Sequence, residues 1–388
     1  MSSCGTTGSR FMGEPGLPRK KTGCCAAAPS RARPRTNNRP VSRRVQTRAF
    51  PGGGSPWAGG PLPRRRPGGR TVGPSLQSAR RSAILSLNSV PGRKLPMPRP
   101  RKIEWPDGAR ICMTFIVPWE VWPENFATSK SGQRTAGHHI PPPDAPFNKS
   151  MSAITEREYG DRVGIWRLLD TFEKYDIKAS LLLNGVKAEE LGRAENADLL
   201  AEVKSQGHEY SSEGYVHEYS YMYTREQEDE SMKKTIKAFE DTFGERPTGY
   251  LSPGHCFTDN TLDLVAENGY TWWADPLNDD QPYILESGNK KVVVIPYNIS
   301  GCNDYSTYKG DRTPRDLMGI WKDQFDQLYE EGEQGYPKFF SLNFHPFVSG
   351  VPYRTRVIRE FLDYVRGHDK VWYAPRIEIA NWFLKQGY

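Results

Sequence analysis

From residue 110 onward, short apolar stretches alternate with amphipathic segments, and this alternation constrains the fold more than any other feature of the chain. Apolar runs such as 110–117 and 178–184 are predicted to be buried strands, whereas 162–175 and 225–244 show the three-to-four spacing of helices. Alternating strands and helices build a parallel sheet covered by helices. Because roughly 280 residues share this one pattern, it favours a barrel over a doubly wound sheet.

The first 96 residues differ in composition from the rest of the chain. They contain 19 Lys and Arg and one acidic residue, Glu14, whereas residues 97–388 contain 34 Lys and Arg and 45 acidic residues. A segment so rich in Pro, Gly and Arg cannot bury enough apolar surface to fold. We therefore expect residues 1–96 to be disordered, either as a transit-like extension or as sequence upstream of a start at Met97. Residues 97–388 are expected to form one folded domain.

Several classes of protein find no support in the sequence. No run approaches the roughly 20 apolar residues of a membrane span, and no signal-peptide core is present, so we expect a cytoplasmic location or an organelle. The six cysteines lack C-x-x-C spacing, which argues against a disulfide framework or a thiolate metal site. No nucleotide-binding glycine fingerprint follows a strand. The acidic folded part argues against nucleic-acid binding, and no membrane partner is expected.

Polar side chains gather where the predicted strands end. In a (β/α) barrel these ends open on one face, where active sites lie, so the sequence predicts an enzyme with its site there. The residues concerned are Glu120, Asn184, Glu213 with His217, Pro253 with His255, Asp275 and His345.

Glu213 and His217 lie four residues apart in SSEGYVHEY, directly after one predicted strand. This pair is half of a metal site, half of a metal-free acid–base site, or a polar helix start that faces solvent. Both functional interpretations require partners from other strand ends.

The motifs at these strand ends resemble those of a known family. From about residue 105 to 386, the chain resembles the polysaccharide deacetylase superfamily (NodB homology, carbohydrate esterase family 4), in its allantoinase-like and peptidoglycan-deacetylase-like branch. GHEYSSEGYVHEY resembles the second family motif, PTGYLSPG the third and ENGYTWWAD the strand with the family's Asp. SLNFHPFVSGVPYR and VWYAPRIEIANW resemble the fifth motif and the C-terminal helix of the allantoinase-like branch. The resemblance implies an α/β fold, a distorted (β/α) barrel with seven or eight strands, and hydrolysis of a non-peptide C–N bond.

The chain departs from that family at three motif positions. Only Glu120 lies near the expected Asp pair, Glu213 replaces the first His of the second motif, and Leu251 replaces an Arg. The implied metal ligands are therefore Glu120, Glu213 and His217, which could hold a divalent metal such as Zn²⁺ with positions open for water and substrate. Without a metal, two adjacent carboxylates would give one raised pKa, and so a general acid beside a general base.

His345 is the candidate acid for a leaving amine, because an imidazole titrates near neutral pH; the alternative is a structural role before Pro346. Asp275 is either a further catalytic residue or a turn-forming residue after the strand. The predicted catalytic set is Glu120, Glu213, His217, Asp275 and His345.

Aromatic residues near the same strand ends suit sugar rings or planar imides, although such residues also fill barrel interiors. The predicted substrate-binding residues are Trp119, Tyr215, Pro253, Gly254 and Trp273. His138 and His139 lie in a Pro-rich loop that either covers the substrate or is a plain surface loop. We expect His208 and His255 to be mainly structural, and His368 to lie at the opposite end of the barrel.

Three functions fit these residues. The first is deacetylation of an N-acetylated sugar or a related small amide by activated water. The second is metal-independent opening of a cyclic amide or imide such as allantoin. The third is a barrel that has lost catalysis and binds a carbohydrate or a partner protein, which would be favoured if Glu120 and Glu213 point apart. The family resemblance also implies a homo-oligomer.

Overall fold

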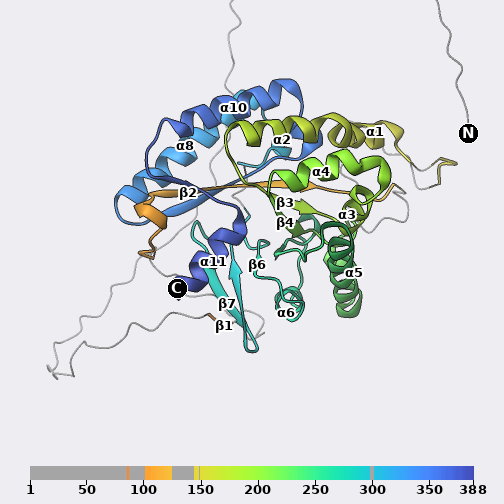
Figure 1. The fold of residues 1–388 in the computed structure, drawn as a ribbon, viewed down its shortest axis with the longest axis horizontal. Helices are drawn as coiled ribbons and strands as arrows, with labels where there is room; N and C mark the ends of the chain where they lie inside the picture. The colour runs from red at the N-terminus through yellow and green to blue at the C-terminus, as the bar shows by residue number, and fades with distance from the viewer. Residues whose placement is uncertain (1–84, 87–100, 125–143, 148, 298–300) are drawn as a thin grey trace, which may run out of the picture. The chain divides into compact units, whose positions relative to one another are not determined.

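The computed structural model describes residues 85–86, 101–124, 144–147, 149–297 and 301–388, all within one compact unit, Leu76–Tyr388 (Figure 1). Most of residues 1–96, and the loop with His138 and His139, lie outside the described residues. Strand β1 (Leu85–Ser86) is the exception, because it pairs in parallel with β7 (Tyr283–Ser287). Two residues of the segment expected to be disordered therefore belong to the sheet, and the domain boundary at residue 96 otherwise stays a prediction.

One curled sheet forms the centre of the described part. Seven strands run parallel in the order β9–β2–β3–β4–β5–β6–β8, and β10 pairs with the first residues of β2. The pairing confirms the predicted distorted barrel, but β7 runs antiparallel to β8 in a hairpin that the alternating pattern did not predict. The remaining strands are β2 (Ile111–Trp119), β3 (Ser180–Leu183), β4 (Glu209–Ser212), β5 (Gly249–Tyr250), β6 (Trp272–Trp273), β8 (Lys290–Val294), β9 (Lys338–Asn343) and β10 (Val371–Tyr373).

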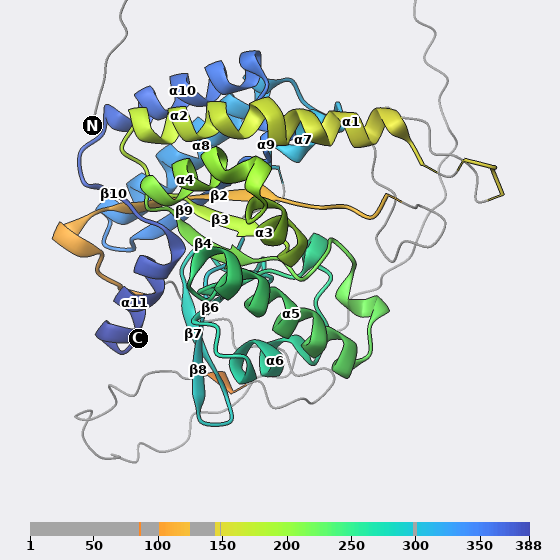
Figure 2. The ribbon, with the colours of Figure 1, turned by 45° about the vertical axis from the view of Figure 1, so that its right-hand side comes forward.

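The helices cover this sheet. Figures 1 and 2 show α2, α8 and α10 together on one side of β2, and α5, α6 and α11 beyond the strands on the other. Among the helices of the described residues, none combines the length and apolar character needed to cross a membrane. The α-helices are α1 (Met151–Tyr159), α2 (Ile165–Lys174), α3 (Gly185–Leu191), α4 (Ala197–Ser205), α5 (Arg225–Phe243), α6 (Thr261–Glu267), α7 (Tyr305–Tyr308), α8 (Pro314–Glu333), α9 (Pro346–Ser349), α10 (Pro352–Arg366) and α11 (Arg376–Gln386).

Strand β2 lies at the centre of the core, and all nine of its residues are buried. Successive side chains of a strand point to opposite faces. Met113 and Phe115 accordingly join the cluster that includes the helices α2, α8 and α10. Cys112 and Ile116 join a second cluster, which includes residues of β6, β8 and α11. A strand buried on both faces is the kind of run that the sequence predicted.

Helix α5 shows how the sequence sets the ends of an element. Thr224 and Gln227 form a reciprocal capping box at its start, which satisfies backbone N–H groups that have no partner inside the helix. Gly244 ends the helix with a φ of 81°, a left-handed conformation that favours glycine. Both features agree with the predicted bounds.

The barrel has a seam, because no pairing among the described strands joins β8 to β9. The buried guanidinium of Arg376 lies at this seam. It donates to the carbonyl oxygens of Ile295, Pro296 and Tyr297 after β8, and to Ser341 Oγ on β9. Burial lowers the pKa of Arg376 to about 9. One side chain therefore takes the place of missing backbone pairing between these two strands.

A π-helical turn, Gly160–Gly164, joins α1 to α2 and brings them close to α9. A Cβ atom on Gly164 would lie 2.1 Å from the carbonyl oxygen of Pro346, and one on Gly160 would lie 2.7 Å from the nitrogen of Phe347. Both positions therefore need glycine. Since α9 begins directly after His345, this contact fixes where that imidazole lies.

Candidate active site

Four of the predicted catalytic residues meet at the carboxyl ends of the strands. Glu120 follows β2, Glu213 and His217 follow β4, and His345 follows β9. All four line one cavity of about 310 Å³. One carboxylate oxygen of Glu120 and one of Glu213 lie within 4.8 Å of one another, so the condition that would favour a barrel without catalysis is not met.

Asn184, at the end of β3, holds two of these loops together. Its side-chain oxygen accepts from the backbone N–H of Val121 at 2.7 Å, and its amide nitrogen donates to the carbonyl oxygen of Glu213. The N–H of His217 donates to the carbonyl oxygen of Val121 at 3.0 Å. The loops after β2, β3 and β4 are thus crosslinked just behind the side chains that line the cavity.

The side chains of Glu120, Glu213 and His217 offer three atoms that could hold a metal, all within 4.8 Å of one another. His217 Nε2 lies 3.5 Å from Glu120 Oε1 and 3.6 Å from Glu213 Oε1, which is too long for good hydrogen bonds. Two ligand atoms each about 2.1 Å from a tetrahedral ion would lie about 3.4 Å apart. The buried Glu213 Oε2 also has no hydrogen-bond partner in the described part of the protein. These residues therefore fit a divalent metal.

Trp122 orients two of these three side chains. Its indole N–H donates to Glu120 Oε2 at 2.6 Å. Its ring also stacks on the imidazole of His217, with centroids 3.9 Å apart and planes 13° apart. The two contacts fix Glu120 and His217 relative to one another.

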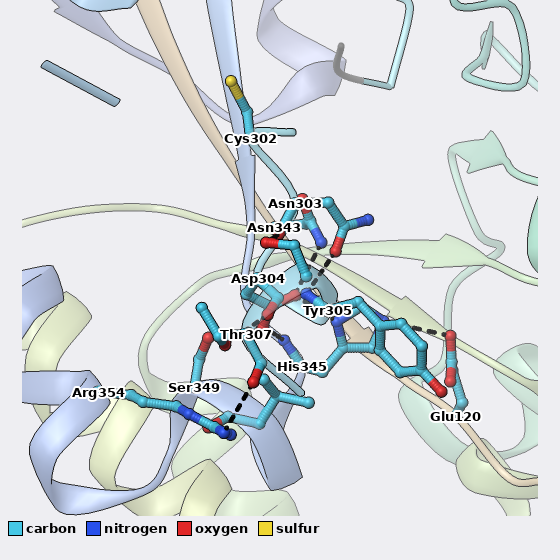
Figure 3. Close-up of polar contacts among 12 residues, drawn as sticks. Glu120, Cys302, Asn303, Asp304, Tyr305, Thr307, Asn343, His345, Ser349 and Arg354 are labelled. Carbon is cyan, nitrogen blue, oxygen red and sulfur yellow. Dashed lines mark hydrogen bonds and ion pairs between the residues drawn. The ribbon is translucent and has the colours of Figure 1, made fainter. Parts of the chain in front are cut away.

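His345 is held by a carboxylate that the sequence analysis did not identify, Asp304 (Figure 3). Asp304 Oδ1 lies 2.7 Å from His345 Nδ1, and Oδ2 accepts from the backbone N–H of His345 at 2.7 Å. Asn343 and Ser349 donate to the same carboxylate at 3.0 and 2.6 Å. On its other side, His345 Nε2 lies 3.5 Å from Glu120 Oε1. The imidazole of His345 therefore lies between the carboxylates of Asp304 and Glu120.

The surroundings of the four side chains drive their pKa values apart. Burial opposes ionisation of Glu120, but His217, His345 and Trp122 outweigh it and lower the pKa of that carboxyl. Burial and the charge of Glu120 raise the pKa of Glu213 well above its usual value. Burial lowers the pKa of His217, whereas Asp304 and Glu120 overcome burial and raise that of His345 well above its usual value. These shifts favour the ionised form of Glu120 and the protonated form of His345, and they disfavour ionisation of Glu213.

The predictions for Trp119 and Tyr215 as substrate-binding residues need correction, because neither lines this cavity. Trp119 is in the main core cluster, and its indole N–H donates to Asp161 at 2.6 Å. Its position as the last residue of a doubly buried strand turns it away from the site. Tyr215 extends in another direction, and its hydroxyl donates to Glu189 on α3.

Asp275 and Trp273 also lie behind the cavity rather than in it. The carboxylate of Asp275 accepts from the backbone N–H of Ser252, at 3.0 and 3.1 Å, and from the Trp273 indole. Burial raises the pKa of Asp275 to about 7. The residue holds the loop after β5 from behind and does not itself line the cavity, and its catalytic role stays a prediction. Of the two substrate-binding residues predicted in that loop, Gly254 lines the cavity and the buried Pro253 does not.

Two histidines outside the predicted catalytic set, His208 and His255, differ in whether they line the cavity. His208 is structural, as expected: Nδ1 accepts from the backbone N–H of Ala179 at 3.2 Å, and Nε2 lies 2.9 Å from Gln206 Oε1. His255 differs from the expectation, because it lines the cavity with a φ of 58°, a conformation uncommon for residues other than glycine.

The loop after β8 forms a wall of the cavity that the sequence analysis missed. Asp304 lies within this segment and reaches the site from behind His345. The signal available was position alone, since the segment follows the predicted strand KVVVIPYN and should open on the same face as the other strand ends. The wall residues are Gly301, Asn303, Tyr305, Ser306, Lys309 and Asp311.

Comparison with known proteins identifies the family. A crystal structure of a probable polysaccharide deacetylase from Pseudomonas aeruginosa PAO1 is 30% identical, covers 72% of this chain and 93% of its own, and superposes with a TM-score of 0.64. The chain belongs to the polysaccharide deacetylase family. The profile of that family, polysaccharide deacetylase, matches residues 149–273.

Two further proteins extend this result. The crystal structure of Puue allantoinase is 29% identical, covers 73% of this chain and 94% of its own, and has a TM-score of 0.64. A peptidoglycan deacetylase from Helicobacter pylori is 26% identical over 269 residues, which are 61% of this chain and 89% of that protein. This polysaccharide deacetylase family member is therefore a hydrolase of carbon–nitrogen bonds other than peptide bonds, as the sequence predicted.

Proposed function

We propose that the protein hydrolyses the amide bond of an N-acetylated sugar or a related small amide, and that Glu120, Glu213 and His217 hold a divalent metal during the reaction. One observation carries this proposal: His345 Nε2, a proton donor, and His217 Nε2, a ligand atom, both lie 3.5 Å from Glu120 Oε1. Acid and candidate ligands thus share one small cavity.

The bound metal would polarise the amide carbonyl and lower the pKa of a bound water. The chain's part in this is to hold two carboxylates and one imidazole with positions left for water and substrate. Crosslinks through Asn184 and Trp122 keep the three ligands in place before the substrate arrives.

His345 supplies the proton that the reaction needs. When water attacks the carbonyl carbon, its oxygen forms the new C–O bond, and the C–N bond breaks as the nitrogen leaves. An amide nitrogen leaves readily only as an amine, so it must gain a proton. The His345 imidazolium donates that proton from Nε2, while Asp304 holds Nδ1 on the far side of the ring. The attacking water loses one proton to the solvent in the cavity, and a proton taken from solvent after product release restores the imidazolium, so the protons balance.

The size of the cavity supports a small substrate. A volume of about 310 Å³ lies at the lower end of the range usual for ligand pockets. One sugar ring with its acetyl group would fill most of this space, so further sugar residues would extend beyond the mouth.

The same size also favours a second candidate, the opening of a cyclic amide. This chain shares 29% identity with Puue allantoinase over most of both chains. In that version Glu120 and Glu213 would act as base and acid without a metal. Assembly into a homo-oligomer, implied by the family resemblance, stays a prediction for either candidate.

The test is an assay of purified protein, with and without added Zn²⁺, on N-acetylglucosamine, its short oligomers and allantoin. We expect release of acetate and free amine from at least one N-acetylated probe, and a loss of about 100-fold or more in His345→Gln. Turnover of allantoin alone, independent of Zn²⁺, would replace the first candidate by the second. No turnover of any probe would contradict both.

A further inference from the structure

Tyr297 lines the cavity beside the catalytic residues but has no assigned role. It follows β8, and only 3% of its surface is exposed. No described residue forms a hydrogen bond with its hydroxyl group, which opens on the cavity. The hydroxyl oxygen is not among the fully buried polar atoms that lack a partner, so it reaches the open space of the cavity. A ligand in the cavity can therefore accept its hydrogen bond.

The backbone and ring of Tyr297 are both held in place. Arg376 Nη2 donates to the carbonyl oxygen of Tyr297 at 3.0 Å, which ties the residue to the barrel seam. The imidazole of His255 packs against the phenol ring edge-on, with centroids 4.4 Å apart and planes at 66°. A donor that is already fixed needs little reorganisation when charge develops on a substrate, which is the condition for strong electrostatic catalysis.

The phenol also remains a donor throughout the working pH range. Burial raises the pKa of Tyr297 well above its usual value, and the carboxylates of Asp304, Glu213 and Glu120 raise it further. Tyr297 lines the same cavity as Glu120, Glu213 and His345. A neutral O–H there can donate to an oxygen atom of the substrate but cannot act as a base.

We propose that Tyr297 is a catalytic residue whose hydroxyl donates a hydrogen bond to the amide carbonyl oxygen as that oxygen becomes negatively charged. The proton stays on the phenol, so no bond of Tyr297 forms or breaks. His345, by contrast, donates its proton to the nitrogen on the other side of the same carbonyl carbon. This assignment rests on the proposed amide hydrolysis and adds a stabilising group for its transition state.

The test is Tyr297→Phe, which keeps the ring against His255 and removes only the hydroxyl. The matched control is Tyr270→Phe, because Tyr270 is equally buried but donates to Ser212 Oγ at 3.3 Å outside the cavity. Loss of one such donor costs about 100- to 1,000-fold in kcat. We expect that loss in Tyr297→Phe, with KM, thermal melting and metal content near those of the wild type, and no comparable loss in Tyr270→Phe. A kcat within threefold of the wild type in Tyr297→Phe would overturn the assignment.

These measurements distinguish an error in the role of Tyr297 from an error in the proposed function. If the wild-type protein turns over an N-acetylated probe and Tyr297→Phe does so equally well, only the role of Tyr297 is wrong. If the wild type turns over no probe, binding of N-acetylglucosamine is measured by NMR titration of both proteins. A several-fold weaker affinity in Tyr297→Phe would support the carbonyl contact, and equal affinity would overturn it.

Discussion

Among individual residues, Asp304 has the largest influence on the proposed chemistry without touching the substrate. Its carboxylate contacts both the ring and the backbone of His345, and two other donors, Asn343 and Ser349, fix its orientation. A carboxylate behind an imidazole sets which ring nitrogen carries the proton that faces the substrate. Asp304 is therefore a positioning residue. Its loss should leave less of His345 in the protonated, correctly oriented form, while the metal ligands of the site stay in place.

Asp304→Asn should lower kcat by about 100-fold, because the neutral amide no longer stabilises the imidazolium of His345. Thermal melting and metal content should stay near the wild-type values, since the amide is the same size as the carboxylate. Asp363→Asn is the matched control, because Asp363 lies on α10, outside the cavity, and accepts a hydrogen bond from the Tyr175 hydroxyl. Steady-state kinetics of the three proteins checks this, and equal kcat in Asp304→Asn and Asp363→Asn would contradict the role.

His208 gives a prediction about stability against pH. Burial lowers its pKa to about 4, and Nδ1 already accepts from the Ala179 N–H, so a proton cannot be added there without breaking that bond. Between pH 6.5 and 4 the unfolded chain binds this proton and the folded protein does not. The free energy of unfolding should therefore fall as pH falls through this window, by up to about 3 kcal/mol from His208 alone.

Urea unfolding of the wild type and of His208→Asn at several pH values between 7 and 4.5 measures that contribution. The variant should be less stable at pH 7, because it loses the fit of the imidazole, but its stability should fall less steeply toward acid pH. Parallel curves for the two proteins would show that the folded state admits the proton and that the account of His208 is wrong.

At the scale of elements, the contact between the π-helical turn and α9 places the catalytic imidazole. Gly164 and Gly350 approach so closely that a Cβ atom on Gly350 would lie 2.3 Å from the Cα of Gly164. Backbone cannot move aside as a flexible side chain can, so even one methyl group must push α9 outward. Because His345 precedes α9 directly, the displacement reaches the active site.

Gly164→Ala should therefore reduce both stability, by roughly 1–3 kcal/mol, and kcat, since the methyl group overpacks this contact. Gly319→Ala is the matched control within helix α8, where a Cβ atom would meet nothing within 4 Å. There the same substitution should stabilise the protein by about 0.5–1 kcal/mol and leave activity unchanged. Urea unfolding and kinetics of both variants decide the matter, and similar effects in the two would refute a special role for the contact.

The elements also show what the sequence could and could not predict. The end of β2 was correctly located, because an apolar run buried on both faces stops where the polar residue Glu120 begins. The β7–β8 hairpin was missed, since its second strand has the same apolar composition as a parallel one. The direction of Trp119 and Tyr215 could not be predicted either, because it depends on one-residue register at a strand end and on the turn at Gly214, which has a φ of 67°.

On the scale of the whole molecule, the barrel depends on Arg376 where backbone pairing is missing. Its donors reach three consecutive carbonyl groups after β8 and the Ser341 hydroxyl on β9. These strands are followed by the loops that carry Asp304 and His345. The contacts of Arg376 at the seam therefore affect both the stability of the barrel and the positions of Asp304 and His345 in the active site.

Arg376→Leu should lower the free energy of unfolding by roughly 3–5 kcal/mol, because it leaves several buried oxygen atoms without donors. The control is Arg356→Leu, since Arg356 is 78% exposed and, among the residues that the structure describes, forms an ion pair with Glu360 on the same helix. Exposed pairs of this kind contribute at most about 1 kcal/mol. Urea unfolding at pH 7 compares the two, and a loss in Arg376→Leu no larger than that in Arg356→Leu would contradict the role of the seam.

The central claim is that Glu120, Glu213 and His217 form a metal centre, and elemental analysis of the purified protein tests it most directly. The comparison uses the wild type and Glu213→Gln, with Glu189→Gln as a control for a carboxylate outside the cavity. The account predicts about one divalent metal per chain in the wild type and in Glu189→Gln, and little or none in Glu213→Gln. The absence of metal from all three proteins, after purification in the presence of Zn²⁺, would contradict it.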